Sequence, residues 1–599
     1  MNHNRFIVVV VSLILLAACG TPDDGQVAAQ ADKSAVVEQQ LNAIIEEHWA
    51  FALAEDPTLA TAVGVSDFND RMPAVTIADE QRRLEAEKAF LRRVRDIDSD
   101  ALSDEARIDA DLFQWVLEDS IGASELRLGR IPFNTFSGFF MNALTASSGV
   151  SMQRTSDYQD YIDRMAEIPR YFDENIDNMR AGVEDLFVLP QIVIDGVLPT
   201  IEAQVKDDPT DSSFYEPFVD MSERVSAEEQ ERLREAGKQV IREQVLPAFA
   251  KLAAFLRDEY QASDTIGAED LLEGEEYYAF NIKRYTTLTD TTADEIHNIG
   301  LDEVKRIREE MDAIIEELNF KGDFAAFGKF LRTDPQFYAT SKEDLLKETA
   351  YITKRIDYVM PGFFGKLPRQ PYGIVAVPDE IAPNYTTGAY YGSPLGAPQG
   401  GAFWINTYAL DQRPLYEIPA LALHEAVPGH HHQNALSSEM EDAPAFRRNL
   451  YFSAFGEGWA LYAEKLGVEM GIYQTPYEHF GRLSYEMWRA CRLVVDTGLH
   501  SQGWTRQQAM EFFLSNTSLS EGNIRAEVDR YISWPGQALA YKLGELKIWE
   551  LRRIAENDLG DRFDLREFHD VVLGNGALPL AMLEQIVLRW VDEKLSEAA

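Results

Sequence analysis

Cysteine is scarce in this sequence, so disulfide bonds cannot explain its stability. The 599 residues contain two cysteines, Cys19 and Cys491. No intramolecular disulfide remains if Cys19 is lipidated, as its context predicts below. The fold must then be stable through its hydrophobic core alone, for which a chain of this length with 45% apolar residues is ample. Cys491 lies in an apolar helical stretch, and we expect a small buried side chain there, not a nucleophile.

Positively charged residues are also few relative to acidic ones. Lysine and arginine number 56 against 100 acidic residues, which gives a net charge of −44. Such a chain repels nucleic acid phosphates and anionic lipid headgroups, and most of the charge should simply keep the surface solvated. A phosphate-binding Walker loop, a dinucleotide glycine motif and a G-x-S-x-G elbow are all absent from the sequence. These absences exclude a polynucleotide partner and the common nucleotide-dependent and serine-hydrolase classes.

The N-terminal apolar run, from Phe6 to Leu16, is too short to span a membrane and has the length of a signal peptide core. Leu16-Ala17-Ala18-Cys19 reads as a lipobox, with cleavage before Cys19 and acylation of its thiol. The alternatives are an uncleaved anchor or a plain signal. Gly20 after the cysteine resembles lipoproteins sent to the outer membrane. We therefore expect a signal peptide over residues 1–19, a flexible tether over 20–34 and a mature protein lipid-anchored in the cell envelope, facing the periplasm.

Histidine is rare too, but four of the ten histidines fall within nine residues, 424–432. An apolar run leads into His424-Glu425, Pro428-Gly429 interrupts the helical pattern, and His430-His431-His432 follows. A core helix seldom carries so many ring nitrogens unless something binds them. This pattern indicates a metal site.

The spacing of these histidines departs from the zinc-hydrolase helix H-E-x-x-H, in which the two histidines lie one turn apart. On a straight helix neither His430 nor His431 could share one ion with His424. Pro428, however, offers no N–H to the preceding turn, and Gly429 can adopt almost any backbone conformation. We therefore predict a kink or bulge at Pro428-Gly429 that brings His430, or as second choice His431, beside His424.

A third ligand is predicted 33 residues after His424, in Phe455-Gly456-Glu457-Gly458-Trp459. An isolated glutamate usually lies on a solvated helix face, but the glycines and apolar residues around Glu457 weaken that interpretation. Carboxylates suit zinc. Glu457 is the predicted ligand, with Glu464 as the fallback.

The combination H-E-A-V-P-G-H-H-x-Q and G-E-G-W-A resembles the bacterial lipoprotein family named domain of unknown function 885. Further matching stretches cover most of the mature chain: His48-Trp49, Asp56 to Gly64, Ala293 to Met311, Tyr390 to Thr407, Arg530-Tyr531, Pro535 to Ala538, Tyr541-Lys542 and Phe568 to Asp570. That family resembles the helical gluzincin peptidases, such as thimet oligopeptidase and angiotensin-converting enzyme. The resemblance implies a mainly α, zincin-like fold in which two helical lobes surround a deep cleft with a small β-sheet near the metal.

Hydrophobic periodicity agrees with a helical body. Apolar residues recur at helical spacing in Leu41 to Phe51 and Asp157 to Met179, and a capping box at Thr292-Glu295 and a cap at Ser341 predict two further helices. The aperiodic stretch Ile131 to Met152 is either an ordered loop lining a cleft or an ordinary surface loop. We expect one domain over residues 35–599, with an N-terminal lobe to about residue 285 and a metal-bearing C-terminal lobe from about 286.

Short β-branched and aromatic runs, Tyr372 to Val377 and Ala402 to Asn406, predict strands. In the helical gluzincins an edge strand just before the metal helix accepts a peptide by backbone pairing. The resemblance therefore implies that Trp404 and Asn406 bind substrate, while the alternative is a structural hairpin.

The chemistry of such a site predicts a zinc-dependent hydrolase. Two imidazoles and a carboxylate leave zinc an open position for water, and Glu425 would act as general base. Tyr541, Tyr531 or His500 would stabilise the oxyanion, and the resemblance favours a tyrosine. Arg492 or Arg530 could hold a substrate carboxylate. We expect a metallopeptidase that cleaves short peptides; the alternatives are a hydrolase of non-peptide amides or esters and a non-enzymatic binding lipoprotein.

Overall fold

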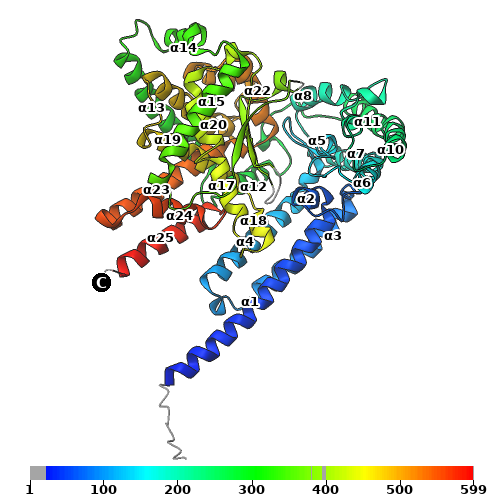
Figure 1. Ribbon diagram of the computed structural model, residues 1–599, viewed down its shortest axis with the longest axis horizontal. Helices are drawn as coiled ribbons and strands as arrows, with labels where there is room; N and C mark the ends of the chain where they lie inside the picture. The colour runs from blue at the N-terminus through cyan, green and yellow to red at the C-terminus, as the bar shows by residue number, and fades with distance from the viewer. Residues whose placement is uncertain (1–21, 380, 394–398, 598–599) are drawn as a thin grey trace, which may run out of the picture.

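The computed structural model describes residues 22–379, 381–393 and 399–597, and these form a mainly helical protein with one small sheet (Figure 1). The predicted helical class is thus confirmed. The signal peptide and the lipidation residue Cys19 lie outside the described residues. Along the described chain, no helix is both long enough and apolar enough to cross a membrane.

The first half of the chain is helical throughout. Its helices are α1 Pro22–Glu55, α2 Pro57–Ala62, α3 Ile77–Arg95, α4 Asp104–Glu125, α5 Phe139–Leu144, α6 Thr155–Ala166, α7 Ile168–Glu184, α8 Gln191–Glu202, α9 Glu216–Val219, α10 Ala227–Val240, α11 Leu246–Asp258 and α12 Gly274–Thr286. A π-helical turn, Ile241–Val245, joins α10 to α11. In Figure 1, α5 to α11 gather at one end of the molecule, and α1 and α3 run alongside one another.

The second half adds the sheet and the remaining helices. These are α13 Ala293–Glu317, α14 Phe324–Thr333, α15 Lys342–Val359, β1 Tyr372–Ala376, β2 Gly388–Tyr391, β3 Gly401–Ile405, α16 Ile418–Glu425, α17 His430–Ser438, α18 Ala445–Arg448, α19 Ser453–Glu469, α20 Pro476–Ser501, α21 Arg506–Asn516, α22 Glu521–Ser533, α23 Ala540–Leu559, α24 Leu565–Leu573 and α25 Leu580–Ser596.

Helix starts follow the capping residues of the sequence. Thr292 accepts from the backbone N–H of Glu295 while Glu295 bonds back to Thr292, so the predicted capping box opens α13. Ser341 caps α15 in the same way through the N–H of Asp344. Both predicted helices are confirmed.

Two predicted segments differ in the structure. The expected single helix from Asp157 to Met179 is divided into α6 and α7 around Glu167, because Pro169 cannot continue the hydrogen bonds of the preceding turn. Helix α1 begins at Pro22, inside the segment expected to be a flexible tether up to Ser34. This segment is rich in Ala, Gln and Asp and continues directly into the packed part of α1, so helix propagates through it.

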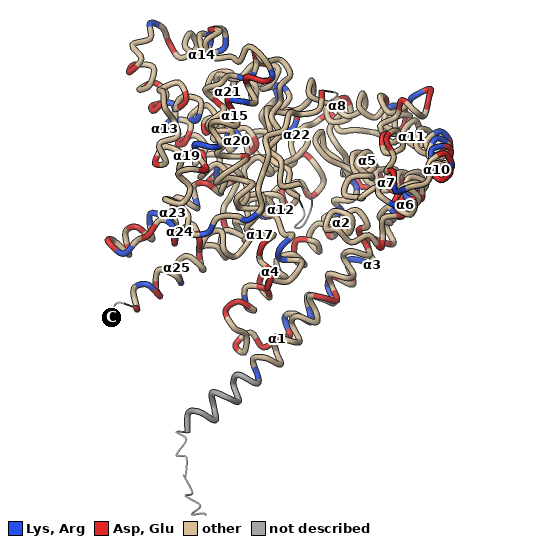
Figure 2. The backbone as a smooth tube through the Cα atoms, viewed as in Figure 1, with Lys and Arg blue, Asp and Glu red and all other residues tan. Residues whose placement is uncertain are grey.

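The interior contains two large apolar clusters, and each combines both halves of the chain. One joins residues of α5 to α11 to α13, α14 and α20 to α22, and the other joins α1, α3 and α4 to α15, the sheet, α16, α19 and α23 to α25. The lobe boundary near residue 285 stays a prediction. Charged side chains of both signs are interspersed along helices such as α3 and α10 (Figure 2).

Helices α19 and α23 pack against each other at the closest helix crossing near the candidate site. A Cβ on Gly458 would lie 2.5 Å from the Cα of Gly544, and a Cβ on Gly544 would lie 1.9 Å from the carbonyl oxygen of Ala454. Only glycine permits this approach. The crossing fixes the start of α23, and with it Tyr541, relative to Glu457 on α19.

The three strands form a sheet in the order β1-β3-β2, with β1 parallel and β2 antiparallel to β3. The predicted strands are confirmed, but the strand before the metal helix is not an edge. Both sides of β3 are paired, so its backbone cannot accept a substrate strand. The expectation that Trp404 lies on a free edge is therefore wrong, because a third strand, β2, covers it.

Candidate metal centre

The helix break predicted at Pro428-Gly429 is present. Helix α16 ends at Glu425 and α17 begins at His430, and the four residues between them form a tight connection. A Cβ on Gly429 would lie 1.9 Å from the carbonyl oxygen of His424, so no other residue fits there. The indole N–H of Trp459 donates to the carbonyl of Pro428 at 2.7 Å and holds the connection against α19.

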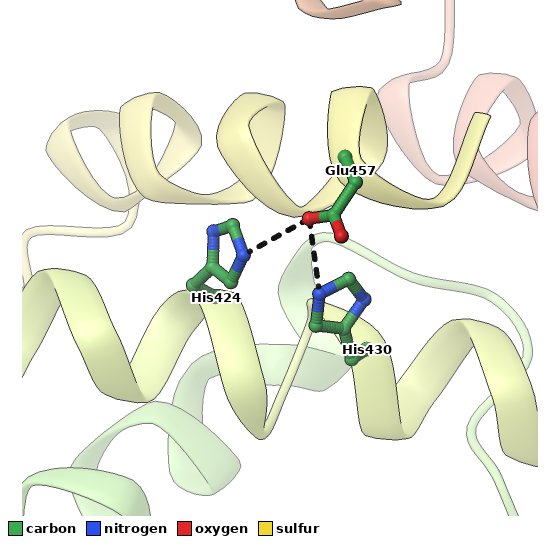
Figure 3. A group of neighbouring side chains, drawn as sticks. All are labelled: His424, His430 and Glu457. Carbon is green, nitrogen blue, oxygen red and sulfur yellow. Dashed lines mark ion pairs between the residues drawn. The ribbon is translucent and has the colours of Figure 1, made fainter. Parts of the chain in front are cut away.

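This break brings His424 and His430 together under α19 (Figure 3). Their ring centroids are 4.8 Å apart and the rings are perpendicular. The Nε2 atoms of His424 and His430 lie 3.5 and 3.4 Å from the same oxygen, Oε2 of Glu457. The three side chains can each offer one ligand atom within 4.8 Å of the others.

These separations suit a small tetrahedral ion. Ligand atoms bound tetrahedrally at about 2.0–2.1 Å from zinc lie roughly 3.3–3.4 Å from one another. The Glu457 oxygen is at nearly that distance from both ring nitrogens, longer than a good hydrogen bond between an imidazole and a carboxylate. The donor set, two imidazoles and one carboxylate, is also that of hydrolytic zinc sites. The residues present therefore fit the metal that the sequence predicts.

The second nitrogen of His424 is bonded as well. Its Nδ1 lies 2.8 Å from Oε1 of Glu464, a buried carboxylate about two turns further along α19 than Glu457. Glu464 is thus not the fallback ligand but the partner that orients His424, as carboxylates do behind metal-bound histidines. Burial disfavours the charged ring, but the bonds to Glu457 and Glu464 outweigh it and raise the pKa of His424 to about 9.

His431, the second choice, lies away from this cluster. Its Nδ1 is 3.0 Å from the hydroxyl of Tyr390, and its Nε2 is 3.0 Å from the carbonyl oxygen of Gln370. Burial lowers the pKa of His431 to about 4. Both ring nitrogens of His431 therefore bind α17 to the sheet and its adjoining segment. His430 is the histidine that lies beside His424 and Glu457.

Glu425 is the last residue of α16 and is buried beside His424. Its charge acts on a neighbouring phenol: burial and the bond to Tyr391 raise the pKa of Tyr385, and the negative charge of Glu425 raises it further. The hydroxyls of Tyr385 and Tyr391 are 2.6 Å apart, and both rings contact Trp404. Trp404 thus belongs to an aromatic group with Tyr385 and Tyr391, and the charge of Glu425 acts on Tyr385 within this group.

Asn406, by contrast, is a structural residue. Its side-chain amide donates to the carbonyl oxygens of Ala382, Tyr385 and Thr386 and accepts from the N–H of Tyr408. The side chain is fully buried. Both polar atoms of the amide are thus engaged within the protein, the nitrogen with the loop between β1 and β2 and the oxygen with Tyr408 after β3, which argues against substrate binding by this side chain.

Two of the three oxyanion candidates are engaged elsewhere. His500 accepts from the N–H of Ala268 and donates to the carbonyl of Tyr531, and burial lowers its pKa to about 4. The hydroxyl of Tyr531 donates to Glu527 and accepts from Arg492, with 1% of the residue exposed. Neither side chain can reach a ligand. Tyr541 is partly exposed and remains a candidate.

Tyr451 is the residue near the cluster that the sequence did not indicate. Its hydroxyl donates to Oε1 of Glu457 at 3.2 Å, and 49% of the residue is exposed. Tyr451 precedes α19 and belongs to no periodic pattern. Sequence spacing gave no signal that could have found it.

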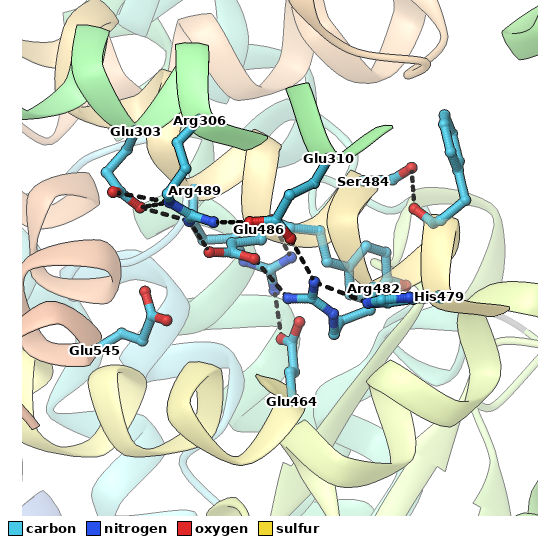
Figure 4. Close-up of polar contacts among 12 residues, drawn as sticks. Glu303, Arg306, Glu310, Glu464, His479, Arg482, Ser484, Glu486, Arg489 and Glu545 are labelled. Carbon is cyan, nitrogen blue, oxygen red and sulfur yellow. Dashed lines mark hydrogen bonds and ion pairs between the residues drawn. The ribbon is translucent and has the colours of Figure 1, made fainter. Parts of the chain in front are cut away.

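Behind the cluster, a buried network of ion pairs joins α13 to α20 (Figure 4), and Lys542 extends it to α23. Lys542, with no exposed surface, lies 2.9 Å from Glu303 and 2.8 Å from Glu486. The other members are Arg306, Glu310, Arg482 and Glu545. Burial raises the pKa of Glu545, and the Lys542 ammonium beside it opposes that shift.

Arg489 connects this helix layer to the metal cluster. Its guanidinium lies 3.9 Å from Oε1 of Glu464 and is stacked on Tyr485 and Trp488 (Figure 4). Cys491, on the same helix, is fully buried with a free thiol, and burial keeps the pKa of that thiol far above its usual range. This agrees with a packing role.

Comparison with known proteins gives a family and a fold. Residues 57–587 match the family model described as "Bacterial protein of unknown function (DUF885)". No curated protein matches the chain. A solved structure described as "the putative lipoprotein from Colwellia psychrerythraea" is 28% identical, with a TM-score of 0.86 over 93% of this chain and 99% of that one. A "putative lipoprotein of unknown function" from Shewanella oneidensis, at 18% identity, 92% and 99% coverage and a TM-score of 0.70, shares the fold.

Proposed function

The chain belongs to the family described as Bacterial protein of unknown function (DUF885), as its motifs predicted, and since that description names no activity, we propose from the site that it is a zinc-dependent hydrolase. Within this class we propose a metallopeptidase that cleaves short peptides in the cell envelope. The two-lobed zincin-like arrangement around a cleft and the likeness to the helical gluzincins belong to this proposal.

One observation carries the proposal: ligand atoms of His424, His430 and Glu457 lie within 4.8 Å of one another, and the Glu457 oxygen is 3.5 and 3.4 Å from the two ring nitrogens. Three further features support it. Glu425 follows His424 directly, Glu464 bonds the far nitrogen of His424, and Tyr451 bonds the second oxygen of Glu457. Two of the three ligands, His424 and Glu457, are therefore each held by a residue outside the cluster, as expected of a site with preorganised ligands.

Zinc bound to His424, His430 and Glu457 would supply a Lewis acid and an acidified water. Glu425 lies one residue after His424, so its side chain is turned about 100° from that ligand and flanks the ion. It would accept the proton of the attacking water and pass it to the leaving amine. With zinc bound, Glu464 would accept the proton on Nδ1 of His424, so that the lone pair of Nε2 would be available to the ion.

The other residues of the site would orient the substrate. Tyr541 is the candidate donor to the developing oxyanion, because Tyr531 and His500 are already engaged. An extended peptide would pair with the outer edge of β2, since β3 is central in the sheet. The aromatic rings of Tyr385, Tyr391 and Trp404 would contact its side chains.

The proposed location is the periplasmic face of the outer membrane, reached through acylated Cys19. The lipobox motivates this location, and the description of the similar Colwellia structure as a lipoprotein supports a lipid-anchored envelope protein. The residue after the cysteine, Gly20, motivates the outer membrane.

The test uses protein purified without chelator. Elemental analysis is expected to find one zinc per chain, and mass spectrometry of a mixed peptide pool is expected to show cleavage that stops with chelator and resumes with zinc. Glu469→Gln is the matched control, because Glu469 lies on α19 but pairs with Arg552 away from the cluster. It should cleave as wild type does.

Absence of a stoichiometric transition metal would overturn the metal centre. Zinc with hydrolysis of simple esters or non-peptide amides alone would assign the second class of hydrolase. Peptides that bind without being cleaved would instead identify a binding lipoprotein.

A further inference from the structure

Glu464 is a buried carboxylate behind the candidate metal centre, and only one of its oxygens is paired. Its Oε1 lies 2.8 Å from Nδ1 of His424, while its Oε2 has no hydrogen-bond partner among the residues that the structure describes. Only 1% of the side chain is exposed. A buried carboxylate is costly unless a cation or several donors compensate its charge. Glu464 therefore needs a partner besides the imidazole of His424.

Arg489 of α20 is the cation that lies beside Glu464. Its Nη2 is 3.9 Å from Oε1 of Glu464 (Figure 4), and its Nη1 donates to the carbonyl oxygen of Tyr485 at 3.3 Å. The guanidinium lies over the rings of Tyr485 and Trp488, which fix its position. Its Nε has no hydrogen-bond partner in the described part of the chain. An unpaired donor and an unpaired acceptor thus belong to two buried charged groups that lie next to each other.

Other buried arginines of the surrounding helices have closer carboxylates. Arg482 lies 2.6 Å from Glu486, and Arg492 and Arg530 lie 3.1 and 3.3 Å from the same oxygen of Glu527. Among the described residues, Glu464 is the one acid with which Arg489 forms an ion pair. The charge of Arg489 is therefore available to Glu464 and is not already used by a nearer acid.

A metal-bound His424 cannot compensate the charge of Glu464. An imidazole that ligates a metal through Nε2 is neutral and keeps its proton on Nδ1. In that state His424 donates a hydrogen bond to Glu464 but brings no charge of its own. Arg489 is then the cationic side chain that the structure places beside Glu464. Without it, the buried carboxylate would shift away from His424, and the ring that it orients would lose its support.

We propose that Arg489 is a positioning residue for the metal: through Glu464 it fixes the ring of His424, so that metal affinity depends on a side chain of α20 that is not itself a ligand. This inference rests on the metal centre of the proposed function and does not require hydrolysis. Helix α20 packs against α16 and α19, which carry the proposed ligands and Glu464, and against α13. The metal centre is thereby coupled to the helix layer behind it.

The test measures zinc affinity by competition with a chromophoric chelator. Arg489→Met removes the cation, and zinc is expected to bind about 10-fold more weakly or worse, as when an outer partner of a metal ligand is lost. Glu464→Gln removes the carboxylate and should weaken binding by about 10- to 100-fold. Arg489→Lys keeps the positive charge and should retain more of the zinc affinity than Arg489→Met does.

A double variant distinguishes action through Glu464 from general damage to the fold. If Arg489 acts through Glu464, Arg489→Met should cause no further loss of zinc affinity once Glu464→Gln is present. Independent effects would instead multiply. If Arg489→Met does not fold, Arg489→Lys takes its place: its smaller loss of affinity should likewise disappear in the Glu464→Gln background.

Arg482→Met is the matched control. Arg482 lies on the same helix, and 3% of its side chain is exposed against 8% for Arg489, but its carboxylate partners are Glu486 and Glu310. Its loss should lower the melting temperature and leave zinc affinity within about 2-fold of wild type, as for sites without a shared partner. Circular dichroism shows that each variant is folded at the temperature of the titration.

Wild-type zinc affinity in folded Arg489→Met overturns the inference. Losses that multiply in the double variant also overturn it, because Arg489 would then act on the fold and not through Glu464. An equal loss of affinity in Arg482→Met has the same meaning. If the wild-type protein binds no zinc, the metal centre itself is overturned. Coupled losses of zinc affinity in a protein that cleaves no peptide support the inference and overturn the hydrolase proposal alone.

Discussion

Glu425 and His424 are adjacent in the chain but have different surroundings, and this difference assigns their roles. Both ring nitrogens of His424 face carboxylates, Glu457 on one side and Glu464 on the other. Glu425, the last residue of α16, bonds neither Glu457 nor Glu464 and lies beside the cluster. At the scale of single residues, these surroundings agree with the proposed roles of His424 as a metal ligand and Glu425 as the base.

Glu425→Gln is therefore expected to keep the zinc and the fold but to lose peptide hydrolysis by several orders of magnitude, because the amide cannot accept a proton. His424→Ala should instead lose the metal. The measurement is zinc content alongside cleavage rate for both variants. Cleavage by zinc-loaded Glu425→Gln at a rate near wild type would show that Glu425 is not the base.

Sequence reasoning at this scale found the residues whose type and spacing are unusual. The histidine cluster around Pro428-Gly429 predicted both the break and the candidate ligands, because proline and glycine restrict the backbone in known ways. It did not find Tyr451 or the role of Glu464. Both depend on which side chains from separate segments meet, and local spacing carries no information on that.

The connection between α16 and α17 is the element on which the cluster depends. Gly429→Ala would place a methyl group 1.9 Å from the carbonyl of His424, so the connection must shift and carry His430 with it. We expect zinc affinity to fall about 10-fold or more and stability to fall by about 1–3 kcal/mol. Competition with a zinc chelator and thermal melting measure the two effects.

The matched control is Gly522→Ala on α22, where an added Cβ meets nothing within 4 Å. That variant should bind zinc as wild type does. Unchanged zinc affinity in folded Gly429→Ala would show that the connection does not position His430.

The start of α6 offers a pH-dependent test. Asp157 accepts from the N–H groups of Gln153 and Arg154 and from the hydroxyl of Ser151. Burial opposes its ionisation, but these bonds and the Arg154 guanidinium outweigh it and lower the pKa of Asp157 to about 2. Because the folded pKa lies below the unfolded value near 4, the ionised carboxylate stabilises the fold above about pH 4, and this is lost as the pH falls toward 2.

Asp157→Asn is therefore expected to lower the unfolding free energy by about 2 kcal/mol at pH 7, with the difference shrinking below pH 4. Denaturant unfolding at several pH values measures it. Asp163→Asn on the same helix is the control, because Asp163 is exposed and bonds only Gln159. A pH-independent difference for Asp157→Asn would contradict the assignment.

The boundaries of helices and strands can be predicted from the sequence where residues at the boundary itself determine them. The capping residues Thr292 and Ser341 predict the starts of α13 and α15, and the β-branched and aromatic runs predict β1 and β3. Periodicity alone predicts a single helix where Pro169 divides the chain into α6 and α7. The position of β3 in the sheet could not be predicted. It depends on pairing with β2 from another segment, and periodicity within one strand does not report its neighbours.

For the whole molecule, the anchor is the testable prediction. Cys19→Ser is expected to release the protein from the membrane fraction into the soluble fraction, because the Cys19 thiol is the proposed site of acylation and Phe6 to Leu16 is too short to span. Cell fractionation with immunoblotting measures this. Cys491→Ser, at the buried cysteine, is the control for thiol loss alone. A Cys19→Ser protein that stays with the membrane would show that the lipobox interpretation is wrong.

The ionic network around Lys542 has a consequence for how relatives of this protein diverge. Replacing Lys542 alone leaves Glu303 and Glu486 buried without their cation, at a cost of about 3–5 kcal/mol. Replacing Glu303 or Glu486 alone likewise leaves the buried Lys542 ammonium without one of its carboxylate partners. Lineages can therefore lose this network only through paired changes, and an alignment of the family should show positions 303, 486 and 542 varying together or not at all.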